Sequence, residues 1–277
     1  MRPELVWRRA LQRSAEAEQA GALIPLSTQV LEQPGVKPFV LRRLVSQTPR
    51  HLLQGGPKPN PFLPWEGALE VDRLDTGHVV LLNKYPVQPG HLLLITQDWQ
   101  PQSGWIRFED WQAVGQLARD TAGLWFFNSC AAAGASQPHR HLQLLPRRPG
   151  EASCPLAALC DAQMEQRQWS WAYQISRRQD PIDCTDLPGL YHHHAEELGL
   201  GSPQLDSQPL HPYNLLFDDH WLLTVRRSRE HCAGFSINAL AFAGYLLATE
   251  KSDLTWLENH GPWKLLEAVA SSATERI

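Results

Sequence analysis

The chain has 277 residues, a length that allows one large domain or two modest ones and a sizeable core. Apolar residues make up 43% of the sequence and charged residues 19%, which is the composition of a soluble globular protein. The formal net charge of −4 excludes a global positive field of the kind that attracts nucleic acids, so any polyanion must be held by local groups.

The first part of the chain predicts a helix, a long loop and a pair of strands. Residues 3–21 show a helical pattern, whereas residues 22–64 are rich in proline and glutamine and predict an ordered loop. Strand-like runs follow at residues 67–74 and 78–86, and the turn-forming sequence Asp-Thr-Gly joins them.

The next elements are strands interrupted by one helix. Apolar residues recur at helical spacing from Phe108 to Ala118, and short apolar runs on either side predict strands at residues 91–96, 124–129 and 139–146. Connections of hairpin length together with one long helix predict an antiparallel sheet with a helix packed on one face, which is an α+β fold.

The composition changes after residue 150, and this predicts three parts of the chain. Residues 151–210 are polar, helix-prone at first and loop-like later, so we expect a helical and loop insertion or linker. It would separate an amino-terminal domain at residues 1–150 from a carboxy-terminal domain at residues 211–277. Within the insertion, the histidine run at Tyr191–Glu197 is more typical of a solvated surface segment than of a metal site.

The carboxy-terminal part predicts a hairpin and two helices. Residues 213–227 are two strands that turn at an Asp-Asp pair, and residues 236–248 and 261–271 show helical patterns, the second opened by a proline. The basic stretch "VRRSREH" at Val225–His231 could meet phosphate, although a surface loop is the simpler interpretation.

The cysteines and the apolar runs bear on the compartment. The five cysteines have irregular spacing and no C-x-x-C pattern, so a disulfide framework or a zinc ribbon is not expected. Residues 1–20 lack the apolar core of a signal peptide, and no apolar run approaches the length of a membrane span. These features predict a cytoplasmic protein with neither a membrane nor a nucleic acid as partner.

The stretch "SQPHRHLQLLP" at residues 136–146 carries the strongest chemical signal. Alternate residues of a strand share one face, so His139, His141 and Gln143 face one side while Arg140 and Leu142 face the other. Three interpretations compete: a strand with tolerated polar residues, a metal site and a catalytic site. A metal site needs further ligands, and neighbouring sequence offers none on the strand.

The catalytic interpretation explains all three side chains. A neutral imidazole is a good nucleophile towards phosphorus near pH 7, provided that its second ring nitrogen is held. A glutamine amide two residues further on can donate to a phosphoryl oxygen as charge builds up. The preceding small residues, "CAAAGAS", allow a backbone to approach a phosphate closely.

The same stretch resembles the H-x-H-x-Q signature of the nucleotidyltransferase branch of the histidine-triad (HIT-like) superfamily. In particular it looks like that of the diadenosine tetraphosphate (Ap4A) phosphorylases, also called ATP adenylyltransferases. The resemblance extends in the family's order over about residues 38–269, through "GGPKPNPFLPWE", "LLNKYPVQPGHLLLIT", "GASQPHRHLQ", "YNLLFDDHWLLTVRRS", "SINALAFAGYLL" and "WLENHGPWKLL". It implies a HIT-like antiparallel sheet with packed helices, and a carboxy-terminal strand-helix part that completes the site.

The resemblance also implies roles for individual residues. His141 would be the nucleophile that carries AMP, Gln143 would contact the same phosphoryl group, and His139 would support the loop. The remaining matches would contact substrate: Lys58, Asn83, Lys84, Asn128, Ser136, Gln137, Ser236 and Asn238.

Two positions depart from the family's pattern. Arg140 stands where a lysine is expected, and a solvated surface position is the simpler interpretation of its charge. Ala241 stands where the family usually has glycine, which puts the carboxy-terminal contact in doubt if the backbone there needs a positive φ. Neither departure touches the histidines or Gln143.

The resemblance implies a phosphorylase that converts Ap4A and phosphate into ATP and ADP through an adenylyl-histidine. Its partners would be small molecules (Ap4A, ATP, ADP and phosphate), with no tightly bound cofactor, and it stays open whether Mg²⁺ arrives with the nucleotide. HIT hydrolases carry a third histidine at the place of Gln143, so the glutamine favours phosphate over water as acceptor. GDP-hexose phosphorylases and hexose-1-phosphate uridylyltransferases share the motif and remain alternatives. A nucleotide-binding module without turnover and a metal-binding protein also remain alternatives.

Overall fold

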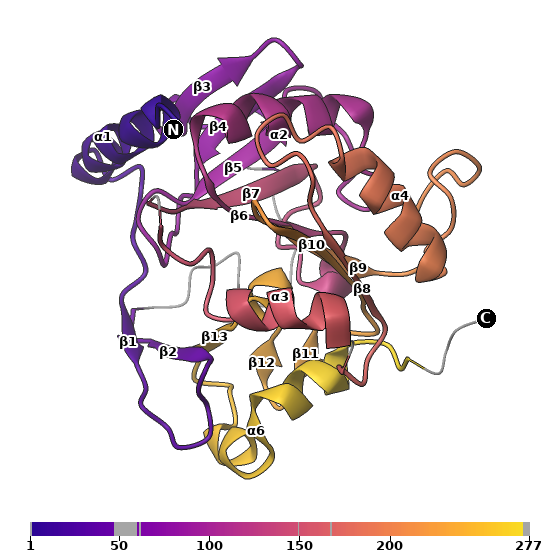
Figure 1. The fold of residues 1–277 in the computed structure, drawn as a ribbon. Coiled ribbons are helices and arrows are strands. Elements are labelled where there is room, and N and C mark those ends of the chain that lie inside the picture. The colour runs from indigo at the N-terminus through magenta and orange to yellow at the C-terminus, as the bar shows by residue number, and fades with distance from the viewer. Residues whose placement is uncertain (1, 47–59, 61, 149, 167, 274–277) are drawn as a thin grey trace.

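One large antiparallel sheet runs through the middle of the molecule (Figure 1). The computed structural model describes residues 2–46, 60, 62–148, 150–166 and 168–273. The sheet has eight strands, in the order β3-β4-β5-β7-β6-β9-β10-β8. Their bounds are β3 Glu70–Leu74, β4 His78–Leu82, β5 Leu92–Thr96, β6 Gly123–Asn128, β7 His141–Pro146, β8 Tyr173–Arg177, β9 Tyr213–Phe217 and β10 Trp221–Arg226. This architecture confirms the predicted α+β fold with an antiparallel sheet.

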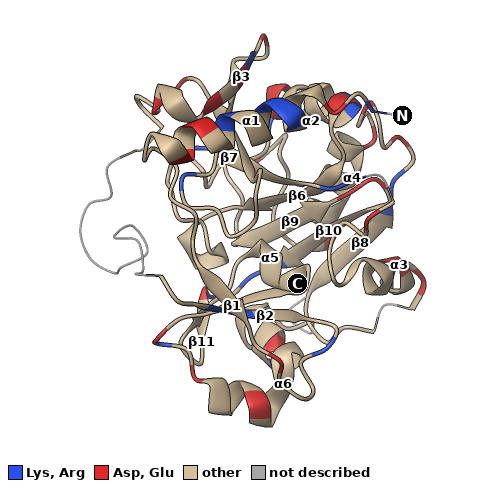
Figure 2. Cartoon of the chain, turned by 90° about the vertical axis from the view of Figure 1, so that its left-hand side faces the viewer, with Lys and Arg blue, Asp and Glu red and all other residues tan. Residues whose placement is uncertain are grey.

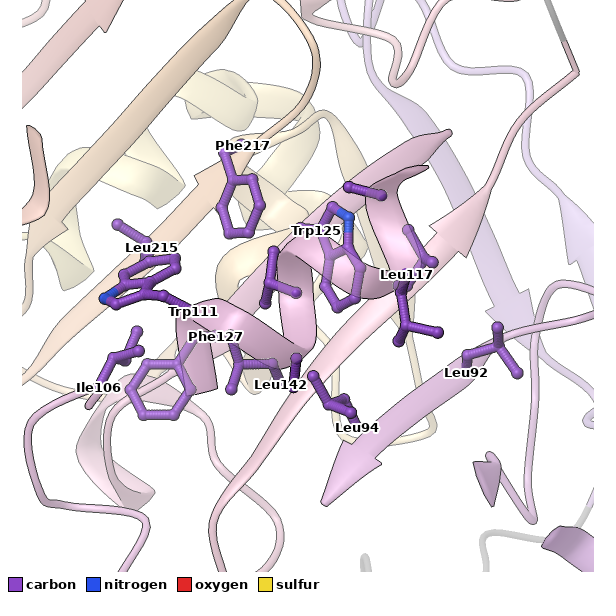
Figure 3. Packing of buried hydrophobic residues seen from close by; sticks show 14 of the residues in the cluster. Leu92, Leu94, Ile106, Trp111, Leu117, Trp125, Phe127, Leu142, Leu215 and Phe217 are labelled. Carbon is purple, nitrogen blue, oxygen red and sulfur yellow. The ribbon is translucent and has the colours of Figure 1, made fainter. Parts of the chain in front are cut away.

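Three helices cover one face of this sheet. They are α1 Leu5–Gln19, α2 Phe108–Asp120 and α4 Leu187–Glu197, and Figure 1 shows them on the same side. Trp111 and Leu117 of α2 pack with Leu142 of β7 and with Trp125 and Phe217 of the neighbouring strands (Figure 3). Full burial of such side chains contributes about 1.5–3 kcal/mol each relative to exposure, so this packing holds the helices on the sheet.

The other face of the sheet is covered by the rest of the chain. Helices α3 Ala157–Gln166, α5 Ala239–Phe242 and α6 Leu254–Val269 lie here, with a three-stranded sheet of β1 Thr28–Val30, β2 Val40–Leu44 and β13 Tyr245–Ala248. A two-stranded sheet of β11 His231–Cys232 and β12 Phe235–Ser236 and the short 3₁₀ turns η2 Gly67–Leu69 and η3 Ala131–Ala133 complete the elements. Leu41 of β2, Phe242 of α5 and Leu265 of α6 share one buried cluster with Leu216 and Leu223 of the large sheet.

Three predictions about local structure were wrong. Residues 22–64, predicted as loop, contain β1 and β2, because β2 pairs in parallel with the distant β13. Residues 236–248, predicted as one helix, form only the short α5 before the chain turns at Gly244 (φ 98°) and enters β13. The predicted surface segment Tyr191–Glu197 lies in α4, where the Tyr191 and His194 side chains are fully buried.

Other predictions were confirmed. The β9–β10 hairpin turns at the Asp-Asp pair, and Leu222 pairs with Phe217 across it. The predicted last helix forms, although α6 begins earlier, at Leu254, and bends at Gly261. The described residues include no helix that is long and apolar enough to span a membrane. The three predicted domain boundaries stay a prediction, and strands from all three parts of the chain lie in the one large sheet.

The prediction that Arg140 is a solvated surface charge was wrong. Its side chain is 1% exposed, and its Nη1 donates to Oδ2 of Asp110 on α2 at 3.0 Å while Nη2 donates to the carbonyl oxygen of Pro101. Oδ1 of Asp110 lies 2.9 Å from Nε2 of His78, which is also buried. A Cβ at Gly104 would lie 2.3 Å from Arg140 Nη2, so a larger residue there would displace the guanidinium. On the outer helix α1 both basic and acidic residues occur, with the arginines before the glutamates along the helix (Figure 2).

We expect Asp110→Asn to lower the free energy of unfolding by about 3–5 kcal/mol, because it leaves the buried Arg140 without a counter-ion. Urea denaturation followed by circular dichroism measures this loss. The matched control is Asp183→Asn, which removes the partner of Arg119 in an ion pair whose side chains are 57% and 51% exposed. Exposed pairs contribute little. Equal losses in the two variants would contradict a structural role for the Arg140–Asp110 pair.

Candidate active site

The histidines lie where β7 begins, on the side of the sheet away from α2. His141 pairs with Ile95 of β5 and Gln143 with Leu93, whereas Leu142 between them packs under α2. His139 precedes the strand and forms an isolated bridge with Pro101. The predicted alternation is therefore confirmed for His141 and Gln143, and the strand starts two residues later than predicted.

His141 is held in one tautomer. Its Nδ1 lies 2.8 Å from the carbonyl oxygen of His139, and because a carbonyl can only accept, Nδ1 carries the proton. The lone pair is therefore on Nε2. The side chain is 3% exposed, and this burial lowers the pKa of His141 to about 4. The ring is neutral at pH 7, which is the form that attacks an electrophile.

His139 has both ring nitrogens engaged. Nε2 donates to the carbonyl oxygen of Thr96 at 2.9 Å, and Nδ1 accepts from the side-chain amide of Asn60 at 3.2 Å. The rings of Phe62 and Trp99 meet it edge-on, at 5.7 and 5.4 Å between centroids. Burial lowers the pKa of His139 as well. A ring held this firmly cannot attack a substrate, but it fixes the backbone whose carbonyl orients His141.

Gln143 is oriented by a histidine that the sequence analysis did not identify. Its Oε1 lies 3.0 Å from Nε2 of His91, and Nδ1 of His91 lies 3.1 Å from the amide nitrogen of Asn83. The Asn83 amide can only donate, so His91 accepts there and donates to Gln143. The Gln143 NH₂ group is therefore left for another acceptor. Burial lowers the pKa of His91 to about 4 and keeps the relay neutral.

A chain of amides supports the backbone of His141. Oε1 of Gln102 accepts from the His141 amide at 2.8 Å, and Nε2 of Gln102 donates to the carbonyl oxygen of Asn128 at 2.7 Å. The side-chain oxygen of Asn128 accepts from Asn214 and from the backbone of Ala239, both at 2.8 Å. The side-chain oxygen of Asn128 in β6 thus binds both β9 and the start of α5. The sequence pattern held no signal for Gln102, since it lies in a loop.

The small-residue loop packs against the carboxy-terminal part. Gly134 has φ 88°, and a Cβ there would lie 2.6 Å from Cβ of Asn238, so only glycine fits. Asn238 caps α5 by accepting from the Leu240 amide at 3.0 Å. Ser136 and Gln137 are half-buried in this loop. The loop that precedes the histidines therefore lies against the start of α5.

Other predicted contact residues have partners elsewhere. Lys84 is bound to Glu66 at 2.8 Å, and its side chain is 39% exposed. Ser236 donates to Glu230. Lys58 lies outside the described residues. Ala241 is helical, without a positive φ, so the missing glycine does not disturb the backbone at this position.

Among the described residues, neither a metal cluster nor the cavity beside Arg140 coincides with the histidines. Within the described ranges there is no group of three or more His, Cys, Asp or Glu that could hold a metal ion. A cavity of about 420 Å³ opens instead beside Arg140 and is lined by Gly104, His192 and Asp206 among others. Since Arg140 and His141 point to opposite faces, this cavity does not reach the candidate nucleophile. What converges at β7 is a neutral imidazole and an oriented amide, which suits attack on phosphorus.

Comparisons with known proteins agree with the resemblance. The family model described as Ap4A phosphorylase N-terminal domain matches residues 1–162, and the model described as ATP adenylyltransferase C-terminal domain matches residues 164–272. "Protein APA1" of Saccharomyces cerevisiae is 37% identical over 73 residues, a match that spans 24% of this chain and 23% of that protein.

The fold is similar to solved structures of yeast Ap4A phosphorylase Apa2. One structure has a TM-score of 0.75 at 20% identity and covers 100% of this chain and 98% of that one. The structure in complex with Ap4A has a TM-score of 0.73 at 21% identity, with 99% and 100% covered. The structure in complex with AMP has a TM-score of 0.73 at 21% identity, with 100% of both covered. The expected HIT-like fold is thereby confirmed.

We expect the side chain of His141 to stay neutral down to about pH 5, because burial disfavours its charged form. Side-chain NMR titration measures this, with the urea-unfolded chain as control. The unfolded chain takes up the proton near pH 6.5 and the folded one only near 4. The free energy of unfolding should therefore fall as pH drops through that window. A midpoint of 6 or higher in the folded protein would contradict the assigned environment.

Proposed function

This chain belongs to the Ap4A phosphorylase family, and on that premise we propose that it is a nucleotidyltransferase that cleaves Ap4A with phosphate to give ATP and ADP. The observation that carries the proposal is the tautomer of His141, whose Nδ1–H is held by the His139 carbonyl so that Nε2 presents its lone pair. Burial keeps this ring neutral at pH 7.

The proposed reaction has two balanced steps. In the first, Nε2 of His141 attacks the phosphorus of one AMP moiety, an N–P bond forms, and the P–O bond to the leaving ATP breaks. In the second, an oxygen of inorganic phosphate attacks the same phosphorus, the N–P bond breaks, and ADP leaves. His141 keeps its Nδ1 proton throughout, and the positive charge on the adenylated ring is stabilised by the His139 carbonyl oxygen 2.8 Å away.

Gln143 would stabilise both transition states. The His91 relay occupies its carbonyl oxygen, so the NH₂ group can donate to a non-bridging phosphoryl oxygen as charge develops. An amide cannot remove a proton from water, in contrast to a third histidine at this position. This difference supports phosphate, whose oxygens are already nucleophilic anions, as the acceptor. His139 would act through the loop rather than on the substrate.

The remaining contacts would come from both parts of the chain. Ser136 and Gln137 of the half-buried small-residue loop, together with Asn128 and Asn238, would line a phosphate path. Lys84 would have to leave Glu66 to reach a ligand, and Asn83 would act through His91. Lys58 and Ser236 keep the roles that the family resemblance implies. Any Mg²⁺ would arrive with the nucleotide.

We also place the protein in the cytoplasm. All five cysteines are free in the structure, which agrees with a reducing compartment. None of them is needed by the proposed chemistry: Cys154 and Cys160 are buried, and burial raises the pKa of both thiols.

We expect the wild-type protein to convert Ap4A into ATP and ADP only when phosphate is present. Without phosphate it should release ATP once and retain AMP on the peptide that contains His141, which intact-mass and peptide mass spectrometry would detect. His141→Ala should lower turnover by roughly 10⁴-fold or more. A parallel assay with GDP-hexose and UDP-hexose tests the related families. Release of AMP without phosphate, or an active His141→Ala variant, would refute the proposal.

A second prediction concerns the relay. His91→Phe should lower kcat by roughly 10- to 100-fold with little change in KM, because Gln143 loses the partner that orients its amide. The matched control is His194→Phe, which removes another fully buried histidine, one that bonds to Ser176 and Thr224 instead. Steady-state kinetics on both folded variants decide the question. A comparable loss of kcat in both variants would mean that His91 only stabilises the fold.

A further inference from the structure

Arg227, directly after β10, is a buried cation held by oxygens alone. The side chain is 1% exposed. The guanidinium donates five hydrogen bonds. Nε donates to the carbonyl oxygen of Val269 at 3.1 Å, and Nη2 donates to the carbonyl oxygens of Arg229 at 2.7 Å and Ile237 at 2.9 Å. Nη1 donates to the carbonyl oxygen of Ala133 at 3.4 Å and to the side-chain oxygen of Asn214. It also lies over the ring of Phe242, 5.3 Å from its centroid. The interpretation of this stretch as a surface loop is therefore wrong for Arg227.

The charge of Arg227 has no directly paired carboxylate among the described residues. Within the described part of the chain, no Asp or Glu oxygen forms an ion pair with Arg227, whereas the buried Arg140 and Arg178 each have one. Burial lowers the pKa of Arg227 to about 10, which the negative charge of Glu230 only partly opposes. The group is therefore charged at pH 7. A buried charge without a counter-ion costs free energy, which a bound anion would recover.

The position of Arg227 points to where that anion would bind. The Ala133 carbonyl belongs to the small-residue loop before the histidines, and the Ile237 carbonyl immediately precedes Asn238 on the other side. Asn214 also donates to both the Ala133 carbonyl and the Asn128 side chain, at 2.8 Å each. The guanidinium thus lies beneath the two segments that line the proposed phosphate path.

We infer that Arg227 is a positioning residue that holds these two segments together and supplies the positive charge that favours binding of the substrate's phosphate groups. It does not touch the ligand, because its side chain is buried and all five donors are used by the protein. Its field acts through a water-poor region, where a charge is felt more strongly than in solvent. The inference rests on the proposed function for the nature of the ligand.

The arrangement also connects Arg227 to the nucleophile. Hydrogen bonds lead from Arg227 to Asn214, from there to Asn128, then through Gln102 to the backbone amide of His141. Loss of the guanidinium would loosen this chain as well as remove the charge. A test must therefore separate phosphate recognition from general support of the site.

The test compares AMP with adenosine, which differ only in the phosphate. Isothermal titration calorimetry on the wild type, Arg227→Met and Arg227→Lys gives the ratio of the two affinities for each protein. We expect Arg227→Met to weaken AMP binding by roughly 10-fold or more and adenosine binding by less than about twofold. Arg227→Lys keeps the charge and should keep the ratio within about threefold of the wild type, even if turnover falls.

The matched control is Arg178→Met. Arg178 is also buried, at 7% exposure, and lies over Phe217 at 5.9 Å, but it is paired with Asp186, and its hydrogen-bond partners lie outside the site segments. Its removal should leave the AMP-to-adenosine ratio unchanged.

Three outcomes overturn the inference. One is an equal change for AMP and adenosine in Arg227→Met, including no change. The second is a tenfold drop in the ratio of AMP affinity to adenosine affinity in Arg227→Lys. This variant tests the inference by itself if Arg227→Met does not fold. The third is a wild-type protein that binds AMP no more tightly than adenosine. Absence of phosphorolysis in the wild type would refute the proposed function. The affinity ratios would still test the role of Arg227 in phosphate binding.

Discussion

One hydrogen bond, from Nδ1 of His141 to the carbonyl oxygen of His139, is the constraint on which the candidate site depends. It decides which ring nitrogen can attack, and burial then keeps the ring neutral. The bond forms only if the backbone at His139 stays in place. The carbonyl oxygen of Thr96 fixes that segment through the ring of His139, and the side chain of Gln102 fixes the backbone amide of His141. Much of the surrounding polar structure therefore serves the orientation of a single imidazole.

The same site joins distant parts of the chain. Strand β6 pairs with β7 on one side and with β9, almost 90 residues later, on the other. Above this junction Asn128, Asn214 and Arg227 form one hydrogen-bonded group. The small-residue loop and the start of α5 are packed too closely for any side chain at Gly134. A polyphosphate bound beside this contact would meet both parts of the chain at once.

The predictions from the sequence matched the structure where apolar and polar residues recur with a clear helical or strand period. The alternation around His141 put it and Gln143 on one face, the helix at Phe108 formed as expected, and the β9–β10 hairpin turned at its two aspartates. The failures have a common cause. Arg140, Arg227 and His194 are polar side chains that a sequence pattern assigns to solvent, yet each is buried because partners far along the chain satisfy it.

The sequence by itself determined the sheet strand that carries the candidate nucleophile, the small-residue loop before it and the family, because these depend on residue type and spacing. Only the tertiary structure decided the tautomer of His141, the relay through His91 and the burial of Arg227. The physical reason is that hydrogen-bond direction and desolvation depend on atoms brought together by folding. His91 lies 52 positions from Gln143 and Arg227 lies 94 from Ala133, and no local pattern encodes such contacts.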